Sequence, residues 1–239
     1  MGISRHDKEL YPRNVRDWEP KPFNIINSSF QEICAEFCRL YGESPSDLQR
    51  RLIAELRSSG NPVVIDLMTN STVTLATLYR QIYSIYPGAP FFGISCGDWL
   101  YEQTEIDKNM GLVYVSGNLR SNETWTKIED QLGQRKAHLI IERAHGGLSY
   151  IPIRPSFLKI AMAKMWNMLD ENNGLLLLQT PPFDVLTYRG IEIEPWIQKV
   201  RNTGISMDVV SSYEHPFDGQ RFGLLGLRKS GRGQQLPGL

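Results

Sequence analysis

The sequence predicts an α/β protein with three layers. We expect a mostly parallel, seven-stranded sheet with a closing antiparallel strand pair, preceded by N-terminal helices. Short apolar runs alternate with segments of helical period over most of the chain, which is typical of a parallel sheet with helical crossovers. The last two apolar runs, at 205–210 and 222–227, are joined by a loop too short for a crossover helix, so they are expected to pair antiparallel.

The length of the chain, 239 residues, suits one folded core with a modest extension. The first segment is polar, carries three prolines and lacks a periodic apolar pattern. The last segment shows no periodic apolar signal either. We therefore expect an extended arm at 1–22, a single domain at 23–229 with N-terminal helices at 23–60 and the sheet core at 61–229, and a flexible tail at 230–239.

The charge balance and the distribution of apolar residues argue against several classes of function. Lys plus Arg equals Asp plus Glu at 26 each, so no global field favours nucleic acid as a partner. No run approaches the roughly 20 apolar residues of a membrane helix, and the first ten residues lack the apolar core of a signal peptide. We expect no membrane association and a cytoplasmic location. Oligomeric state is not indicated.

Two N-terminal helices are predicted from their start signals. Ser29 with Glu32 forms a capping box, and Ser44 before Pro45 starts the second helix. Cys34 and Cys38 are spaced i and i+4 on the first helix. With no His or further Cys at metal spacing, buried packing is favoured over zinc, and no metal site is predicted.

The segment that organises the rest begins at Val63. Three β-branched residues end at Asp66 and are followed by a polar loop and a helical pattern from Val73. The carboxyl ends of parallel strands border the crevice where ligands bind. We therefore expect ligand contacts from Asp66 and the loop residues Met68, Thr69, Asn70 and Ser71. The alternative is that Asp66 caps a helix and the loop merely begins it.

The remaining elements follow in alternation. Further parallel strands are predicted at 91–95, 111–115, 137–141 and 175–178, and helices at 124–132, 156–170 and 194–203, with a weak helical pattern at 98–109. No G-x-G-x-x-G follows a predicted strand, and no G-x-x-x-x-G-K-[ST] occurs. Both absences disfavour a nicotinamide enzyme and a nucleotide triphosphatase.

Three local motifs accompany this order of elements. Val64-Ile65-Asp66-Leu67, Gly117-Asn118-Leu119 and His138-Leu139-Ile140-Ile141 resemble the first-, third- and fourth-strand motifs of class I S-adenosylmethionine-dependent methyltransferases, which have a Rossmann-like fold. The likeness extends from about residue 62 to residue 229. It implies S-adenosyl-L-methionine as cofactor, bound by Asp66, Met68, Thr69, Asn70, Ser71, Ser95, Cys96, Asp98, Asn118 and Leu119.

The sequence departs from the family pattern at two cofactor motifs. Met68, Asn70 and Thr72 stand where three glycines normally allow the backbone to approach the cofactor closely. Ser95 stands where an acid normally holds the ribose hydroxyls. Asp98 could supply that carboxylate, or it could be an ordinary turn residue.

The resemblance places acceptor chemistry after strands four and five. A histidine ordinarily titrates near neutral pH, and His145 is flanked by Gly146, so it is a candidate general base together with Glu142. The expected acceptor is a small molecule, near aromatic residues that core packing also explains: Tyr150, Phe183, Tyr188 and Trp196. Two functions remain open, which are methyl transfer and an inactive methyltransferase-like scaffold.

Overall fold

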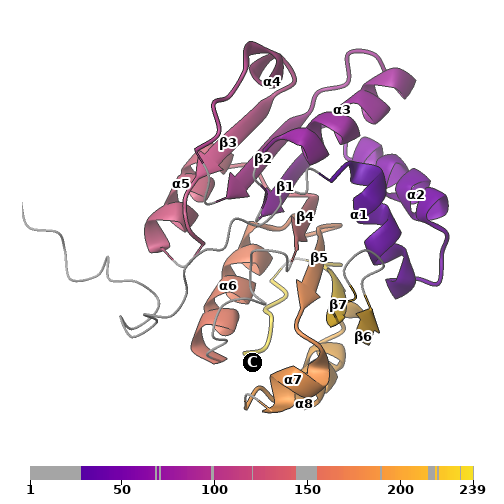
Figure 1. Cartoon of the computed structure of the whole chain (residues 1–239), viewed down its shortest axis with the longest axis vertical. Coiled ribbons are helices and arrows are strands. Elements are labelled where there is room, and N and C mark those ends of the chain that lie inside the picture. The colour runs from indigo at the N-terminus through magenta and orange to yellow at the C-terminus, as the bar shows by residue number, and fades with distance from the viewer. Residues whose placement is uncertain are drawn as a thin grey trace, which may run out of the picture.

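A mixed β-sheet forms the centre of the molecule (Figure 1). The computed structural model describes residues 28–67, 69, 71–97, 100–119, 121–143, 155–188, 190–214, 219, 221–231 and 233–238. Its seven strands lie in the order β3-β2-β1-β4-β5-β7-β6. Five pair in parallel, and β7 is antiparallel to both of its neighbours. The strands are β1 Val63–Leu67, β2 Phe92–Gly97, β3 Leu112–Ser116, β4 Leu139–Glu142, β5 Leu175–Thr180, β6 Ser206–Glu214 and β7 Arg221–Arg228.

Helices cover both faces of the sheet and complete the three predicted layers. The apolar side chains of α1, α2 and α3 pack on one face, and those of α5, α6 and α8 pack on the other. The described helices are α1 Phe30–Phe37, η1 Cys38–Leu40, α2 Pro45–Ser58, α3 Val73–Ile85, α4 Glu105–Asn109, α5 Asn122–Leu132, α6 Pro155–Met168, α7 Phe183–Tyr188 and α8 Ile193–Asn202. The predicted fold class and the antiparallel closing pair are therefore confirmed.

The alternation of side chains along β1 assigns each of its residues to one face. Ile65 belongs to the core under α5 and α6, whereas Val64 belongs to the core under α1, α2 and α3. Asp66 follows Ile65 and therefore points toward the α3 face, because successive strand residues point to opposite sides. All five residues of β1 are buried, so a carboxylate is held within the central strand of the sheet.

The predicted starts of the N-terminal helices are confirmed. Ser29 Oγ accepts from the Glu32 amide, and Ser44 Oγ accepts from the Asp47 amide at 3.2 Å. Cys34 and Cys38 are both buried. Among the described residues there is no group of three or more His, Cys, Asp or Glu side chains that could hold a metal ion.

The second strand is longer than predicted. The prediction ended this strand at residue 95, but Cys96 and Gly97 also lie in β2, because the ladder continues through the pairs Leu67 with Cys96 and Gly97 with Ser116. The weak helical pattern after this strand produces only the five-residue α4. The short α7, which follows two prolines, was not predicted at all.

The C-terminal segment follows β7 and lies beside α6 (Figure 1). Trp166 Nε1 donates to the Gln234 carbonyl at 2.8 Å, and Trp196 Nε1 donates to the Pro237 carbonyl at 2.8 Å. Leu236 packs against the core on the same face. The segment thus satisfies the polar atoms of two indoles whose rings are almost completely buried. The sequence-based expectation of a flexible tail did not anticipate these contacts.

Deleting residues 234–239 is expected to destabilise the protein. The deletion leaves two buried indole N–H groups without acceptors, which costs about 2–4 kcal/mol in total and corresponds to a melting temperature lower by roughly 5–10 °C. Differential scanning calorimetry measures the shift. Gln235→Ala is the matched control, because this side chain is exposed and the substitution keeps every backbone carbonyl, so the variant should melt with the wild type. Equal melting of the truncated and full-length chains would contradict the prediction.

Candidate functional site

The order of the strands reverses its direction at β1 and β4. The chain continues from β1 to β2 and β3 on one side, then crosses to β4 on the other, so the direction of winding reverses at this pair. Open α/β sheets bind ligands outside the carboxyl ends of their strands at such a reversal. The register pairs Asp66 with Ser95 and Leu67 with Glu142. Three polar side chains predicted for the site therefore lie at the carboxyl edge of neighbouring strands.

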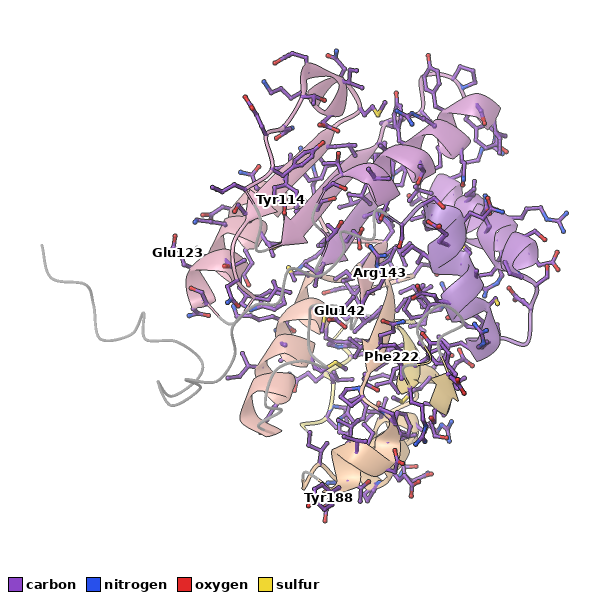
Figure 2. The ribbon with its side chains drawn as sticks, in the orientation of Figure 1. Tyr114, Glu123, Glu142, Arg143, Tyr188 and Phe222 are labelled. Carbon is purple, nitrogen blue, oxygen red and sulfur yellow. The ribbon has the colours of Figure 1, made fainter. Side chains whose placement is uncertain are left out.

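A buried ion pair occupies this edge. Asp66 is fully buried, and Arg143, the residue after β4, places Nη2 at 3.4 Å from its Oδ2. The same Nη2 donates to Thr74 Oγ1 on α3 at 3.3 Å, and Thr74 in turn donates to the Ser28 carbonyl at 2.9 Å. Glu142 and Arg143 lie near the centre of the molecule in Figure 2. One guanidinium thus ties β1 and β4 to the helix that follows β1.

Burial dominates the electrostatics of Asp66. Removal from water raises the pKa of this carboxyl, and the Arg143 guanidinium together with the Thr74 hydroxyl offsets only part of that rise. The carboxylate of Glu36 on α1 adds to the rise. The acid predicted to face a ligand is therefore already engaged with a cation.

Several buried polar atoms at this edge have no hydrogen-bond partner among the described residues. They include Oδ1 of Asp66, Oγ of Ser95 and Nε of Arg143. A buried donor or acceptor without a partner costs about 1–3 kcal/mol, and such groups are normally satisfied by water or a ligand. The edge between β1, β2 and β4 consequently has hydrogen-bonding capacity that the described protein atoms do not use.

The loop after β1 is held by its own hydroxyl groups and by β2 and β3. Thr69 Oγ1 donates to the Ser71 carbonyl at 2.9 Å, and the Thr69 amide donates to the Cys96 carbonyl at 2.9 Å. Tyr114 on β3 donates from its hydroxyl to the Thr69 carbonyl at 3.2 Å. Ser71 Oγ also accepts from the Val73 amide at 3.3 Å, so the loop does begin α3, as the alternative interpretation proposed. Asp66, by contrast, lies within β1 and caps no helix.

Close backbone approach occurs at Gly97, the last residue of β2. A Cβ atom on Gly97 would lie 1.8 Å from the Thr69 carbonyl oxygen. No L-side chain tolerates that distance. The sequence lacks glycines in the loop after β1, but a glycine at the end of the neighbouring strand allows that loop to lie against the sheet.

A second polar cluster holds the far end of the loop. Thr72 Oγ1 donates to Asp107 Oδ1 at 2.6 Å and lies 3.1 Å from the Tyr101 hydroxyl. Tyr101 donates to Asp107 Oδ2 at 3.0 Å, and both the amide and the hydroxyl of Thr104 donate to the same oxygen. Burial opposes ionisation of Asp107, but these hydrogen bonds outweigh it and hold the pKa of the carboxyl below its ordinary value.

The remaining candidate residues occupy different environments. Cys96 is buried in β2, and Leu119 is buried with its carbonyl accepting from Trp125 Nε1 at 2.7 Å. Asn118 is exposed. Met68, Asn70, Asp98 and His145 lie outside the described residues. Their contacts with a cofactor or acceptor therefore stay predictions.

The candidate acceptor aromatics divide between core and surface. Phe183 and Trp196 are buried in the core under α6 and α8. Tyr188 is 92% exposed at the end of α7, far from Glu142 in Figure 2. Tyr150 lies outside the described residues. Glu142, the candidate base on β4, is completely buried.

Sequence reasoning missed four residues that shape this edge. They are Gly97, Tyr101, Asp107 and Arg143. Arg143 directly follows the predicted fourth strand, so its position at the carboxyl edge was available from the sequence. Thr104-x-x-Asp107 has the spacing of a capping pair, which marks the start of α4 but gives no sign of the bond to Thr72.

The strand order, with its reversal at β1 and β4, defines a Rossmann-like three-layer α/β fold. The antiparallel pairing of β6 and β7 is the closing pair that the sequence predicted, and β7 lies between β5 and β6. No protein-family model matches the sequence, and no curated protein is significantly similar to it.

Several solved structures of methyltransferases align with this chain at low similarity. The N-methyltransferase NodS from Bradyrhizobium japonicum WM9 is 10% identical, with a TM-score of 0.43 over 77% of this chain and 96% of NodS. A class I methyltransferase of Listeria monocytogenes, itself described as putative, is 10% identical, with a TM-score of 0.47 over 90% of this chain and 72% of its own.

A third solved structure is longer than this chain. MycE from the mycinamycin biosynthetic pathway, in complex with Mg and SAH, is 8% identical with a TM-score of 0.47 over 87% of this chain. The match spans 56% of the length of MycE. These likenesses are distant, and the strand order itself defines the fold. No described helix is both long enough and apolar enough to span a bilayer.

Gly97→Ala is expected to displace the loop after β1. The new methyl group would collide with the Thr69 carbonyl, a backbone atom that a rotamer change cannot move, so the free energy of unfolding should fall by about 1–3 kcal/mol. Urea denaturation measures the loss. Gly231→Ala is the control, because its Cβ would meet nothing within 4 Å. If the two variants are equally stable, Gly97 does not serve the close approach described above.

Asp107→Asn is expected to lose stability in a pH-dependent manner. The folded pKa of Asp107 lies below its ordinary value of 3.8. The carboxylate therefore stabilises the fold fully above that value, and the contribution disappears as the pH falls through the folded pKa. At pH 7 the variant should be less stable by about 2 kcal/mol, the magnitude of a hydrogen-bonded charged group. Urea denaturation of both proteins between pH 3 and pH 7 should show a difference that shrinks with acidification; a constant difference would contradict the prediction.

Proposed function

We propose that the chain binds S-adenosyl-L-methionine in the crevice between β1 and β4 and transfers its methyl group to a small-molecule acceptor. The supporting observation is the set of buried polar atoms without described partners at the carboxyl edge, on Asp66, Ser95 and Arg143. They lie at the reversal of the sheet, where folds of this type bind nucleosides. Equal numbers of acidic and basic residues favour a small acceptor over nucleic acid.

The residues at this edge fit a polar, uncharged part of a nucleoside. The Ser95 hydroxyl can both donate and accept, so it suits a ribose hydroxyl in place of the acid that the family uses. Oδ1 of Asp66 offers an acceptor beside it, since Ser95 and Asp66 are paired in register. In the proposed complex, Asn118 and Leu119 contact the adenine, while Met68, Thr69, Asn70, Ser71, Cys96 and Asp98 surround the remainder of the cofactor.

The proposed reaction is an in-line displacement. The bound cofactor supplies an electrophilic methyl group on a sulfonium, and the protein accelerates transfer mainly by aligning the acceptor nucleophile. Where the acceptor loses a proton, His145 is the proposed base. Glu142 at the end of β4 lies three residues earlier in the sequence and is the second candidate. Because Glu142 is buried, it would act as a base on an acceptor that the protein encloses.

A scaffold without cofactor is the competing function, and one observation favours it. Arg143 already accompanies Asp66, and the loop after β1 is anchored to β2 and β3. These internal contacts could hold the carboxyl edge and the loop after β1 in place without a bound ligand. The two functions differ in a single measurable property, which is affinity for the adenosyl cofactor.

Isothermal titration with SAM and with S-adenosylhomocysteine tests the proposal. Binding of either ligand supports methyl transfer, and no heat at millimolar ligand would remove it in favour of the scaffold. Ser95→Ala sharpens the test: it should weaken S-adenosylhomocysteine binding about tenfold through one lost hydrogen bond, while stability is unchanged or increased by about 1 kcal/mol, since a buried unpaired hydroxyl disappears. Ser84→Ala, on the exposed side of α3, is the matched control and should bind as the wild type does.

A further inference from the structure

We propose that Asp107 is a positioning residue that fixes the glycine-free loop after β1 in the shape required for cofactor binding. It acts through Thr72 and Tyr101 and does not itself touch the cofactor. This inference rests on the proposed function for the ligand, but the holding of the loop can be measured without any ligand.

The loop is clamped at both of its ends. Its first described residue, Thr69, is held by the Cys96 carbonyl and the Tyr114 hydroxyl. Its last residue, Thr72, is held by Asp107. A loop without glycines has fewer backbone conformations open to it, yet it still needs fixed ends if its amides are to present one geometry to a ligand. The contact at Thr72 comes from Asp107 on α4 and not from a strand of the sheet.

The Thr72 side chain does not form the capping hydrogen bond that is usual at its position. Thr72 is the N-cap residue of α3, a position where a threonine normally accepts from an amide of the first helical turn. Here its side chain makes no capping bond. The hydroxyl instead donates 2.6 Å to a carboxylate 35 residues away in sequence. A charge-assisted bond to Asp107 has replaced a local cap, which indicates that the position of the loop is what this side chain secures.

Asp107 divides its two oxygens between two tasks. Oδ2 accepts from the amide and hydroxyl of Thr104 and thereby caps α4. Oδ1 accepts from Thr72. The Thr72 bond uses Oδ1, whereas Tyr101 and the cap of α4 share Oδ2. The Thr72 bond can therefore be removed by mutation while the cap remains.

Tyr101 links the two clamps to each other. Its hydroxyl lies 3.1 Å from Thr72 Oγ1 and donates to Asp107. Its ring packs at 5.0 Å against the ring of Tyr114, whose hydroxyl donates to the Thr69 carbonyl. A continuous set of contacts therefore runs from one end of the loop to the other. The segment between β2 and α4 thus helps to hold the loop that follows β1.

Thr72→Val tests the inference, with Thr104→Val as its control. Thr72→Val keeps the shape of the side chain and removes only the clamp, whereas Thr104→Val removes only the hydroxyl that supports the cap of α4. Hydrogen exchange without ligand should rise about tenfold at the amides of residues 69–76 in Thr72→Val, the loss expected for one charge-assisted hydrogen bond. Exchange there should be unchanged in Thr104→Val. Tyr101→Phe should give an intermediate rise.

The second measurement is S-adenosylhomocysteine affinity. Thr72→Val should weaken it about tenfold and Thr104→Val less than twofold. Wild-type exchange at 69–76 in Thr72→Val, or equal effects of Thr72→Val and Thr104→Val, would overturn the positioning role. If the wild type binds no S-adenosylhomocysteine, the proposed function fails, while the exchange comparison still decides whether Asp107 holds the loop.

Discussion

The buried pair of Asp66 and Arg143 is the interaction on which the carboxyl edge depends. Burial in the middle strand of a sheet removes the Asp66 carboxyl from water and raises its pKa, and a well-placed cation or donor offsets part of that cost. Arg143 fills this role from the end of β4, and its contact with Thr74 extends the connection to α3 and to Ser28 before α1. One guanidinium therefore connects β1 and β4 to α3 and, through Thr74, to the residue range just before α1. Removing either charge would leave the other buried without its partner.

Polar interactions continue beside this pair on the same face. Gln179 of β5 donates to Glu36 of α1 at 2.8 Å and lies in contact with Tyr213 of β6. The face under α1 and α3 is thus apolar over most of its area but polar toward the carboxyl ends of the strands. Such networks specify one arrangement of the elements, since a shifted helix would leave several groups unsatisfied. The N-terminal helices belong to the site for that reason as well as to the core.

The sequence predicted the fold through local signals. Alternation of apolar runs, capping residues such as Ser29 and a short link before the last strand need only neighbouring residues to be recognised. The site depends on partners that are remote in sequence: Arg143 meets Asp66 across 77 positions, and Thr72 meets Asp107 across 35. No spacing rule relates such pairs. Gly97 was likewise hidden, because its importance comes from the Thr69 carbonyl that lies against it, and not from any pattern in β2.

The C-terminal segment shows how much a stretch without periodicity can contribute. Its backbone carbonyls accept from Trp166 and Trp196, and Trp125 donates to the Leu119 carbonyl, so each tryptophan in the described part of the chain has its indole N–H on a backbone oxygen. Two of these three indoles therefore have their hydrogen-bond acceptors in the segment at residues 234–237. The emission of these two indoles therefore depends on whether residues 234–237 lie against α6 and α8.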